Sequence, residues 1–225
     1  IVIAVLIALV YTAIQLPKLD AVQRWLAATV SDNVEQQLGI PISIGQLRVD
    51  NLNGITLTDI LVLDEKYGTL VYANEAAASI ELVDLLKGKL YFNTLAFAAP
   101  DIRLNRPVPG SPLNIQFIID NLSSDNKEKK ETDLRINQLI IYDGKFKYDV
   151  LSEAHENGKF DPNHIEIKEF AGNISLKNFN KENLNLYIRS IKGKEKSGLD
   201  LQKLKTRVTA RDNKMLLSGF GLELP

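Results

Sequence analysis

The chain of 225 residues contains no cysteine, which excludes disulfides, thiolate metal ligands and cysteine nucleophiles. Its formal net charge is −1, so no basic field indicates a nucleic-acid partner. Histidine occurs only twice. The rest of the composition, 45% hydrophobic and 24% charged, is ordinary for a folded protein of one or two domains.

Sequence patterns of catalytic and metal sites are also missing. His155 and His164 fall in one expected loop, HENGKFDPNH, near Glu153, Glu156 and Asp161. Their spacing fits no metalloprotease motif, and a solvated loop is the expectation. The segment GKEKSG lacks the spacing of a phosphate-binding loop, and no G-x-S-x-G elbow occurs. The sequence therefore predicts a protein that is not an enzyme and has no metal site and no cofactor.

The most apolar segment is the first one, IVIAVLIALVYTAIQL. A membrane-spanning helix needs about 20 apolar residues, and this run is cut at its front edge. We therefore expect a transmembrane signal anchor over residues 1–17, truncated at its start. A cleaved signal peptide and a buried core helix are the alternatives. The chain begins inside this run and ends inside an alternating strand, so the sequence is expected to be part of a longer protein.

Residues 18–40 are expected to form an amphipathic helix. Asp20 is placed to cap its start and Gly39 to end it. The polar face is not basic, so the apolar stripe is expected to cover the end of a β domain and not to lie on lipid. Trp25 has two open interpretations, an aromatic ring at the membrane interface or a ring packed on the next domain. The stripe consists of Val22, Leu26, Val30, Val34 and Leu38.

Residues 41–225 alternate between apolar and polar positions, which predicts strands in a repeating β-groove domain. Tight turns are expected at Asn53-Gly54 and Asp143-Gly144, because these residues tolerate positive φ. Two short helices are expected to interrupt the strands. One is LVDLLKGK after Glu81, and the other is SPLNIQFIIDNL with Ser111 as its cap and Pro112 at its first position.

One spacing recurs along the chain. ISIGQLRV, LYFNTLAF and LRINQLII share the pattern apolar-x-apolar-x-x-apolar-x-apolar, and IEIKEFAG and LDLQKLKT keep its first three positions. A β-bulge at the x-x pair would keep all four apolar side chains on one face and bend the strand. Alternatively, the strands cross a corner and serve two faces. The x-x pairs are Gly45-Gln46, Asn93-Thr94, Asn137-Gln138, Lys168-Glu169 and Gln202-Lys203.

These features predict a mainly β fold. The expected helices are too few to cover the apolar face of so many strands. We therefore expect an elongated, curved antiparallel β-sheet that turns an apolar interior toward a groove. The expected groove residues are Ile42, Ile44, Leu47, Val49, Ile55, Leu57, Leu90, Phe92, Leu95, Phe97, Ile136, Leu139, Ile141, Ile167, Phe170, Leu201 and Leu204.

The first 150 residues contain three motifs, preceded by the expected apolar anchor and amphipathic helix and followed by the helix sequence LNIQFII. The motifs are Ile42-x-Ile44-Gly45-x-Leu47, Ile55-x-Leu57-x-Asp59-Ile60, and LLKGKL followed by Leu95, Phe97, Pro100, Ile102, Leu104 and Arg106. In this series the chain resembles the N-terminal region of the AsmA/TamB family of Gram-negative envelope proteins. Beyond residue 150 the resemblance rests on the repeat, and the lysine- and asparagine-rich loops are similar to TamB-like proteins of Bacteroidota.

The resemblance implies a taco-shaped β-sheet with an apolar interior. It also implies a single-pass inner-membrane protein whose bulk lies in the periplasm and which carries phospholipids toward the outer membrane. An alternative implied role is a scaffold or assembly factor for outer-membrane proteins. In that case a β-barrel partner in the outer membrane would bind through a C-terminal region that this chain lacks.

Overall fold

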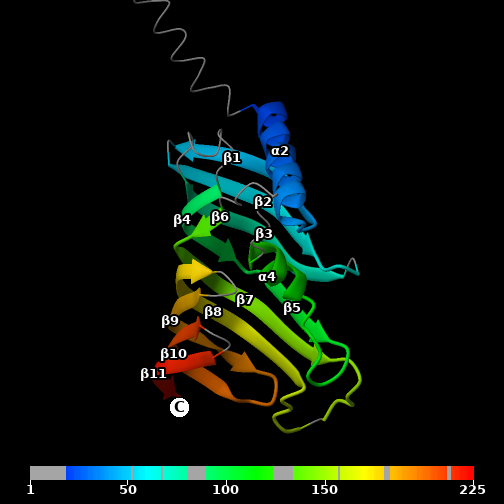
Figure 1. Ribbon diagram of the computed structural model, residues 1–225, viewed down its shortest axis with the longest axis vertical. Coiled ribbons are helices and arrows are strands. Elements are labelled where there is room, and N and C mark those ends of the chain that lie inside the picture. The colour runs from blue at the N-terminus through cyan, green and yellow to red at the C-terminus, as the bar shows by residue number, and fades with distance from the viewer. Residues whose placement is uncertain are drawn as a thin grey trace, which may run out of the picture.

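The computed structural model describes residues 19–51, 53–66, 68–80, 90–123, 134–156, 158–179, 183–211 and 214–225. This part of the chain is mainly β, with one large mixed sheet and the helices α2 (Asp20–Leu38) and α4 (Gln116–Ser123) (Figure 1). Within it, no helix is long and apolar enough to cross a membrane. The expected membrane anchor at residues 1–17 and the expected short helix after Glu81 lie outside the described residues.

The strands stack along the long axis of the molecule, from β1 at one end to β11 at the other (Figure 1). Their order is β1-β2-β3-β4-β7-β8-β9-β10-β11, and β5 and β6 extend the positions of β4 and β7. The strands are β1 (Ile42–Asn51), β2 (Gly54–Leu63), β3 (Thr69–Ile80), β4 (Leu90–Ala98), β5 (Asp101–Arg106), β6 (Leu134–Ile136), β7 (Gln138–Val150), β8 (His164–Phe179), β9 (Asn183–Glu195), β10 (Asp200–Arg211) and β11 (Lys214–Glu223).

The sheet is mixed, which corrects the expectation of a purely antiparallel one. β4 runs parallel to β6 and β7, and β5 runs parallel to β7, whereas the other pairs are antiparallel. The reason is the connection from β5 to β6 across residues 107–133, which includes α4. A tight hairpin would reverse the chain, but a long crossover returns it to the end where β4 begins.

Two of the expected bulges lie where β4 pairs first with β6 and then with β7. β4 has one extra residue relative to β3 between Phe92 and Thr94, which places a bulge at Asn93. Asn137 separates β6 from β7, and its backbone N–H donates to the carbonyl of Phe92 at 2.9 Å. Both irregularities fall at the predicted x-x pairs.

Two more expected bulges lie in β8 and β10. β8 has one extra residue relative to β7 between Ile167 and Phe170, where Glu169 takes a positive φ of 52°. β10 has one extra residue relative to β9 between Leu201 and Leu204. The register slips predicted at Lys168-Glu169 and Gln202-Lys203 are therefore confirmed.

The expected slip at Gly45-Gln46 is wrong, because the register of β1 and β2 is continuous there. The position opposite Gly45 is Asp59, which has a positive φ of 51°. A Cβ atom added to Gly45 would lie only 3.0 Å from the Cβ of Asp59. The irregularities of β1 and β2 lie opposite each other, at Gly45 and Asp59. The register therefore does not shift, and Ile44 and Leu47 both face the core.

The expected turn at Asp143-Gly144 is also wrong. β7 runs through both residues, and Asp143 accommodates a bulge with a positive φ of 50°. Gly144 is needed for close packing, because a Cβ atom at this position would lie 3.0 Å from the carbonyl oxygen of Pro100. By contrast, the chain does reverse at Asn53 to form the predicted β1–β2 hairpin.

α2 confirms the expected helix and its end. Gly39 takes a left-handed conformation with φ 62°, and its N–H donates to the carbonyl of Glu35 at 2.8 Å. The expected cap is wrong, because Leu19 is the N-cap residue and no side chain caps this end. The helix lies over β1, with Ala27 fully buried against the sheet. As expected, it covers the end of the β domain.

Trp25 lies on the outer side of α2 and is 63% exposed. Packing of this ring on the following domain, one of the two interpretations of the sequence, is therefore wrong. The buried line of the helix is centred on Gln23, Ala27 and Ser31, one position from the expected stripe. Gln23 is tolerated there because its Oε1 accepts a hydrogen bond from Gln46 Nε2 at 2.6 Å.

α4 begins later than the sequence predicts, at Gln116 and not at Pro112. Ser111 does not cap the helix, since its hydroxyl donates to the carbonyl of Val108 at 2.7 Å within the preceding loop. The proline-rich segment therefore forms a separate turn. Asn114 joins this turn to β5, because its side-chain oxygen accepts from the N–H of Asn105 at 3.0 Å.

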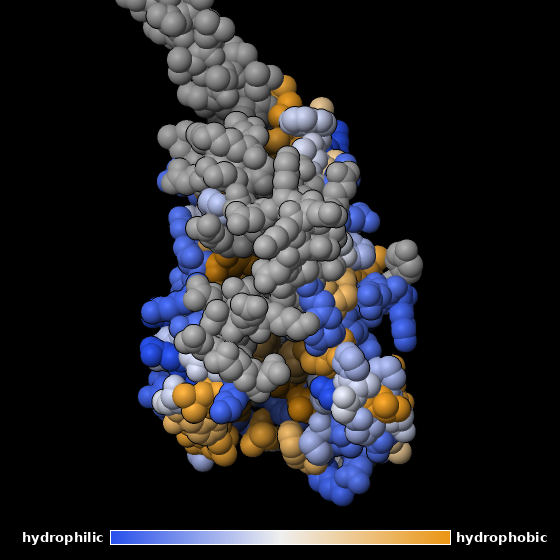
Figure 2. Space-filling view, viewed as in Figure 1, coloured by the Kyte–Doolittle hydropathy of each residue, from blue (hydrophilic) through white to orange (hydrophobic). Residues whose placement is uncertain are grey.

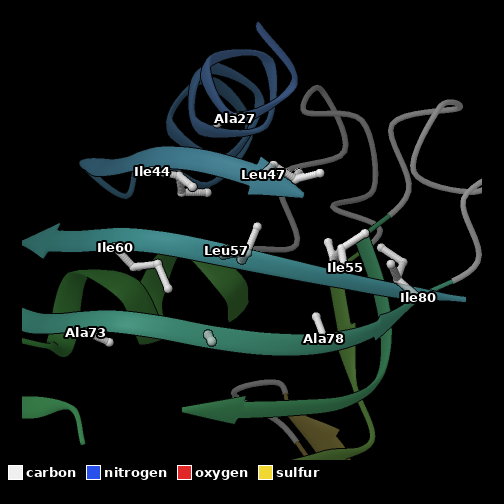
Figure 3. Packing of buried hydrophobic residues seen from close by; sticks show 10 residues of the cluster. Ala27, Ile44, Leu47, Ile55, Leu57, Ile60, Ala73, Ala78 and Ile80 are labelled. Carbon is white, nitrogen blue, oxygen red and sulfur yellow. The ribbon is translucent and has the colours of Figure 1, made fainter. Parts of the chain in front are cut away.

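The best-buried core lies between α2 and the first three strands (Figure 3). Figure 3 shows Ala27 of α2 above the side chains of β1, with those of β2 and β3 below. Leu47 and Ile80 are fully buried, and Ile55 is 2% exposed. Phe92, Leu95 and Phe97 of β4 pack against the edge of this cluster.

Two glycines on neighbouring strands provide a test of the packing. A Cβ atom at Gly193 would overlap Ile167 and would lie 3.2 Å from the carbonyl oxygen of Lys168, whereas one at Gly172 would meet Ile141 at 3.9 Å. Gly193→Ala is therefore expected to lower the free energy of unfolding by about 1–3 kcal/mol. Gly172→Ala, the matched control, is expected to change the free energy of unfolding clearly less, because its added Cβ atom would make only an ordinary van der Waals contact. Urea unfolding measures both values, and equal effects would contradict this packing.

Candidate functional site

The candidate site is the face of the sheet that α2 covers at one end. Residues that are direct partners across neighbouring strands point to the same face. One row of such partners crosses nine strands, and every member is apolar or glycine. Its members are Leu47, Leu57, Ala76, Phe97, Ile141, Gly172, Ile191, Leu204 and Leu222.

A second row runs beside the first on the same face. It begins under α2 and ends at Thr206, whose side chain is buried. Its other members are all apolar. The row consists of Val49, Ile55, Ala78, Leu95, Leu139, Ile174, Ile188 and Thr206.

A third row lies nearer the other ends of the strands. It ends at Glu195, which is buried. The ring of Phe146 in this row contacts the ring of Phe170 in a tilted arrangement, with centroids 5.6 Å apart. The row consists of Ile42, Val62, Val71, Ile102, Phe146, Ile167 and Glu195. Together the three rows make a broad apolar surface, here called the apolar face.

The register brings nearly all of the expected groove residues to the apolar face. Ile42, Ile44, Leu47 and Val49 pack in one cluster, so the three-residue gap does not send half of β1 to the other side. The alternative in which strands serve two faces is therefore wrong for β1. Leu201 also belongs to the apolar face. Its partner on β9 is Gly193, which points to the same side as Ile191 two residues earlier.

The segment LRINQLII behaves in the same way. Ile136 is the partner of Phe92, Leu139 of Leu95, and Ile141 of Phe97. All three partners pack against the same cluster, so both sides of the gap at Asn137 share the apolar face. Leu90 lies on β4 opposite Leu134.

Exposure of the apolar face increases along the sheet. Leu47 is fully buried under α2 and Leu57 is 8% exposed. Ile191 and Leu204 are only half-buried, and Leu222 on the edge strand is 50% exposed. Figure 2 shows apolar side chains in the hollow of the lower part of the molecule. Among the described residues, α2 therefore covers one end of this face, whereas the side chains at the other end are partly exposed.

The opposite face of β7–β10 has a different character. It contains a recess of about 950 Å³ along the row Ile140, Asn173 and Ser190. Charged side chains line it, and the Nζ of Lys194 donates to a carboxylate oxygen of Glu169 at 2.9 Å. The presence of these charged side chains distinguishes the recess from the continuous apolar face.

Glu195 ends the third row through a network of donors. Its carboxylate accepts from the hydroxyl of Ser197, from the N–H of Ser197 at 2.7 Å and from the N–H of Glu166 at 3.4 Å. Burial raises the pKa of the Glu195 carboxyl, but these hydrogen bonds outweigh it and hold the pKa below the ordinary value of 4.5. The ionised carboxylate therefore stabilises the β9–β10 turn.

Because its pKa is lowered, Glu195 stabilises the fold above about pH 4.5, and this contribution is lost as the pH falls through the folded-state value. Glu195→Gln is expected to lower the free energy of unfolding at neutral pH by roughly 1–2 kcal/mol. The difference between wild type and variant should shrink as the pH falls below 4.5 and through the lowered pKa of Glu195. Urea unfolding at several pH values measures it, and a difference that grows on acidification would contradict the assignment.

Sequence reasoning missed several members of the apolar face. β3 contributes Ala76 and Ala78, which are too small to stand out as core residues. β9 carries the pattern Leu186-x-Ile188-x-x-Ile191, the same three-residue gap as in the recognised repeats. Tyr187 beside it obscured the alternation, although the spacing was a usable signal.

In comparisons with known proteins, no family model matches the chain, and no curated protein matches its sequence.

Proposed function

We propose that this protein conducts phospholipids between the inner and outer membranes, as an inner-membrane-anchored periplasmic member of the AsmA/TamB family. The observation that carries the proposal is the apolar row that continues without a polar break from Leu47 to Leu222. Family membership itself rests on the resemblance of the motifs in the first 150 residues.

The length of the first apolar row favours a conduit for lipids and argues against a pocket that holds one ligand. Nine strands at a spacing of about 4.8 Å span roughly 38 Å. The hydrocarbon core of a bilayer is about 30 Å thick, so one acyl chain covers about half of that depth. The row is thus longer than one acyl chain, and a bound chain could move along it without leaving an apolar surface.

The energetics also favour an apolar trough. Each CH₂ group of an acyl chain gains about 0.8 kcal/mol when it leaves water. A carrier protein without an apolar surface would leave many of these CH₂ groups exposed to water at the same time. An apolar face with an open side would keep acyl chains out of water while head groups stay hydrated. This function requires no catalytic residue, cofactor or metal.

The proposal is tested by the lipid content of the purified protein. The chain would be extracted from membranes in a mild detergent and analysed by native mass spectrometry. We expect bound phospholipid that survives detergent exchange and is displaced by excess free phospholipid. A protein that remains lipid-free at every detergent concentration would overturn the conduit.

A further inference from the structure

Three potential metal ligands meet where β7 passes into β8. Asp149 lies near the end of β7, His164 is the first residue of β8, and the two are direct partners across the strands. His155 comes from the loop between these strands. The ligand atoms of the three side chains lie within 4.8 Å of one another.

The expectation of a solvated loop holds for only part of this cluster. His155 is exposed, but the side chain of His164 is 6% exposed and belongs to a strand. The sequence spacing did not indicate the cluster because its carboxylate, Asp149, comes from the preceding strand and not from the loop. Only the antiparallel pairing brings the three groups together.

The hydrogen bonds of His164 leave a site for a cation. Its Nε2 lies 3.1 Å from the carbonyl oxygen of Glu153, an acceptor, so this nitrogen carries a proton. In the neutral ring, Nδ1 then has a lone pair that faces the Oδ1 of Asp149 at 3.2 Å. Two lone pairs that face each other in a largely buried position require a proton or a metal ion between them.

The separation of these two atoms suits a metal. Zinc binds histidine nitrogen at about 2.0–2.1 Å and carboxylate oxygen at about 2.0–2.2 Å, which puts two tetrahedral ligands roughly 3.3 Å apart. The 3.2 Å between His164 Nδ1 and Asp149 Oδ1 matches this edge. The hydrogen bond from Nε2 to Glu153 would orient the ring, as outer partners do in metal sites.

The loop places His155 against the pair. Its ring stacks on that of His164, with centroids 3.7 Å apart and planes at 29°. Stacked rings do not direct their lone pairs to one point, so His155 has to tilt to complete the set, which its exposed position allows. Asp161 holds the loop in shape, because its buried carboxylate accepts from the N–H groups of Glu156 at 3.0 Å and Asn163 at 2.9 Å.

Lys147 forms an ion pair with the cluster. Its Nζ pairs with Oδ2 of Asp149 at 2.9 Å and leaves Oδ1 to face His164. The lysine side chain is 47% exposed, so it can move toward solvent when a second cation binds. A metal ion would gain the carboxylate oxygen that the lysine does not use.

We propose that Asp149, His155 and His164 form a binding site for one divalent transition-metal ion of the Zn²⁺ type. Two imidazole nitrogens and one carboxylate oxygen are a donor set that such ions accept, with water in a fourth position. The ion would fasten the 151–163 loop to the ends of β7 and β8. This site lies outside the apolar rows and is independent of the proposed lipid function.

Calorimetric titration of the detergent-solubilised chain with ZnCl₂ tests the site. We expect one ion per chain, and binding weakened roughly tenfold or more in His155→Gln, a change on an exposed loop. Lys159→Gln is the matched control, because it removes a charge from the same loop, and Lys159 pairs with Glu156 and not with any of the three ligands. It should bind Zn²⁺ as the wild type does.

Co²⁺ gives an independent readout through the visible absorption of tetrahedral sites. The wild type is expected to show this absorption and His155→Gln to lose it. Absence of Zn²⁺ binding, or equal binding by wild type and His155→Gln, would overturn the site. In that case the cluster is a proton-bridged pair that only joins the loop to the sheet.

Discussion

Leu139→Asp is expected to reduce phospholipid transfer at least tenfold while the sheet stays folded. Leu139 lies in the middle of the second row, between Leu95 and Ile174, and its side chain is half-buried. A carboxylate there would remain hydrated and would oblige an acyl chain to pass a charge, which costs several kcal/mol in an apolar environment. Transfer of a fluorescent phospholipid between vesicles by the detergent-solubilised chain measures the effect.

The matched control for this change is Tyr142→Asp on the same strand. Tyr142 is 57% exposed and lines the polar recess on the opposite face. Tyr142→Asp introduces the same charge into β7. It should leave phospholipid transfer within about twofold of the wild type, since surface substitutions have small effects on the fold. Circular dichroism would check that both variants are folded. Equal loss of transfer in the two variants would contradict a function of the apolar face.

Leu47→Ala is expected to have the largest effect on stability. Leu47 is fully buried between α2 and the first strands, where it begins the longest apolar row (Figure 3). Truncating a fully buried leucine leaves a cavity and typically lowers the free energy of unfolding by about 3 kcal/mol. Urea unfolding, monitored by circular dichroism, measures this value.

Trp25→Ala is the control for Leu47→Ala because it removes a larger side chain from an exposed position in α2. It should change the free energy of unfolding by less than about 0.5 kcal/mol. If Trp25→Ala destabilises as much as Leu47→Ala does, α2 uses a different face than the one seen against β1.

The sequence predicted the β content and four of the strand irregularities, whereas further register shifts, such as those in β9 and at Asp143, were not predicted. The three-residue gap was informative because side-chain direction in a strand has a period of two, so a gap of three requires a compensating bulge. Asn93, Asn137, Glu169 and the segment between Leu201 and Leu204 all lie where that reasoning placed them. Local periodicity was sufficient for these positions.

The parallel pairing of β4 with β7 was outside the reach of the same reasoning. Alternation along a strand is the same whichever way its neighbour runs, so it carries no information on direction. The turn at Asp143-Gly144 failed for a related reason. Residues that tolerate positive φ serve bulges as well as hairpins, and only the pairing of β7 with β5 and β8 shows which one is used.

The position of the buried line on α2 also depends on tertiary contacts. The apolar stripe Val22, Leu26 and Val30 flanks this line, whose centre contains Gln23 and Ala27. Ala27 permits close approach to β1, and Gln23 finds a polar partner in Gln46. Neither of these advantages is visible in the periodicity of hydrophobic residues alone.

The histidine cluster illustrates a further limit. His155 and His164 are nine residues apart with no recognised motif, and their carboxylate partner lies earlier in the chain. A strand pair and a loop held by Asp161 bring them together. Sequence spacing identifies metal sites built on one element, whereas this one depends on the register of two strands.

The most direct test of the apolar face is site-specific photo-crosslinking in cells. A photoreactive residue would replace Phe97, Leu139 or Leu204, which lie on successive parts of the apolar face. The controls would carry it at Tyr142 or Lys192 on the opposite face. The lipid-conduit proposal predicts crosslinked phospholipid at the first three positions and none at the controls. Absence of lipid adducts from the apolar face, or equal labelling of both faces, would contradict it.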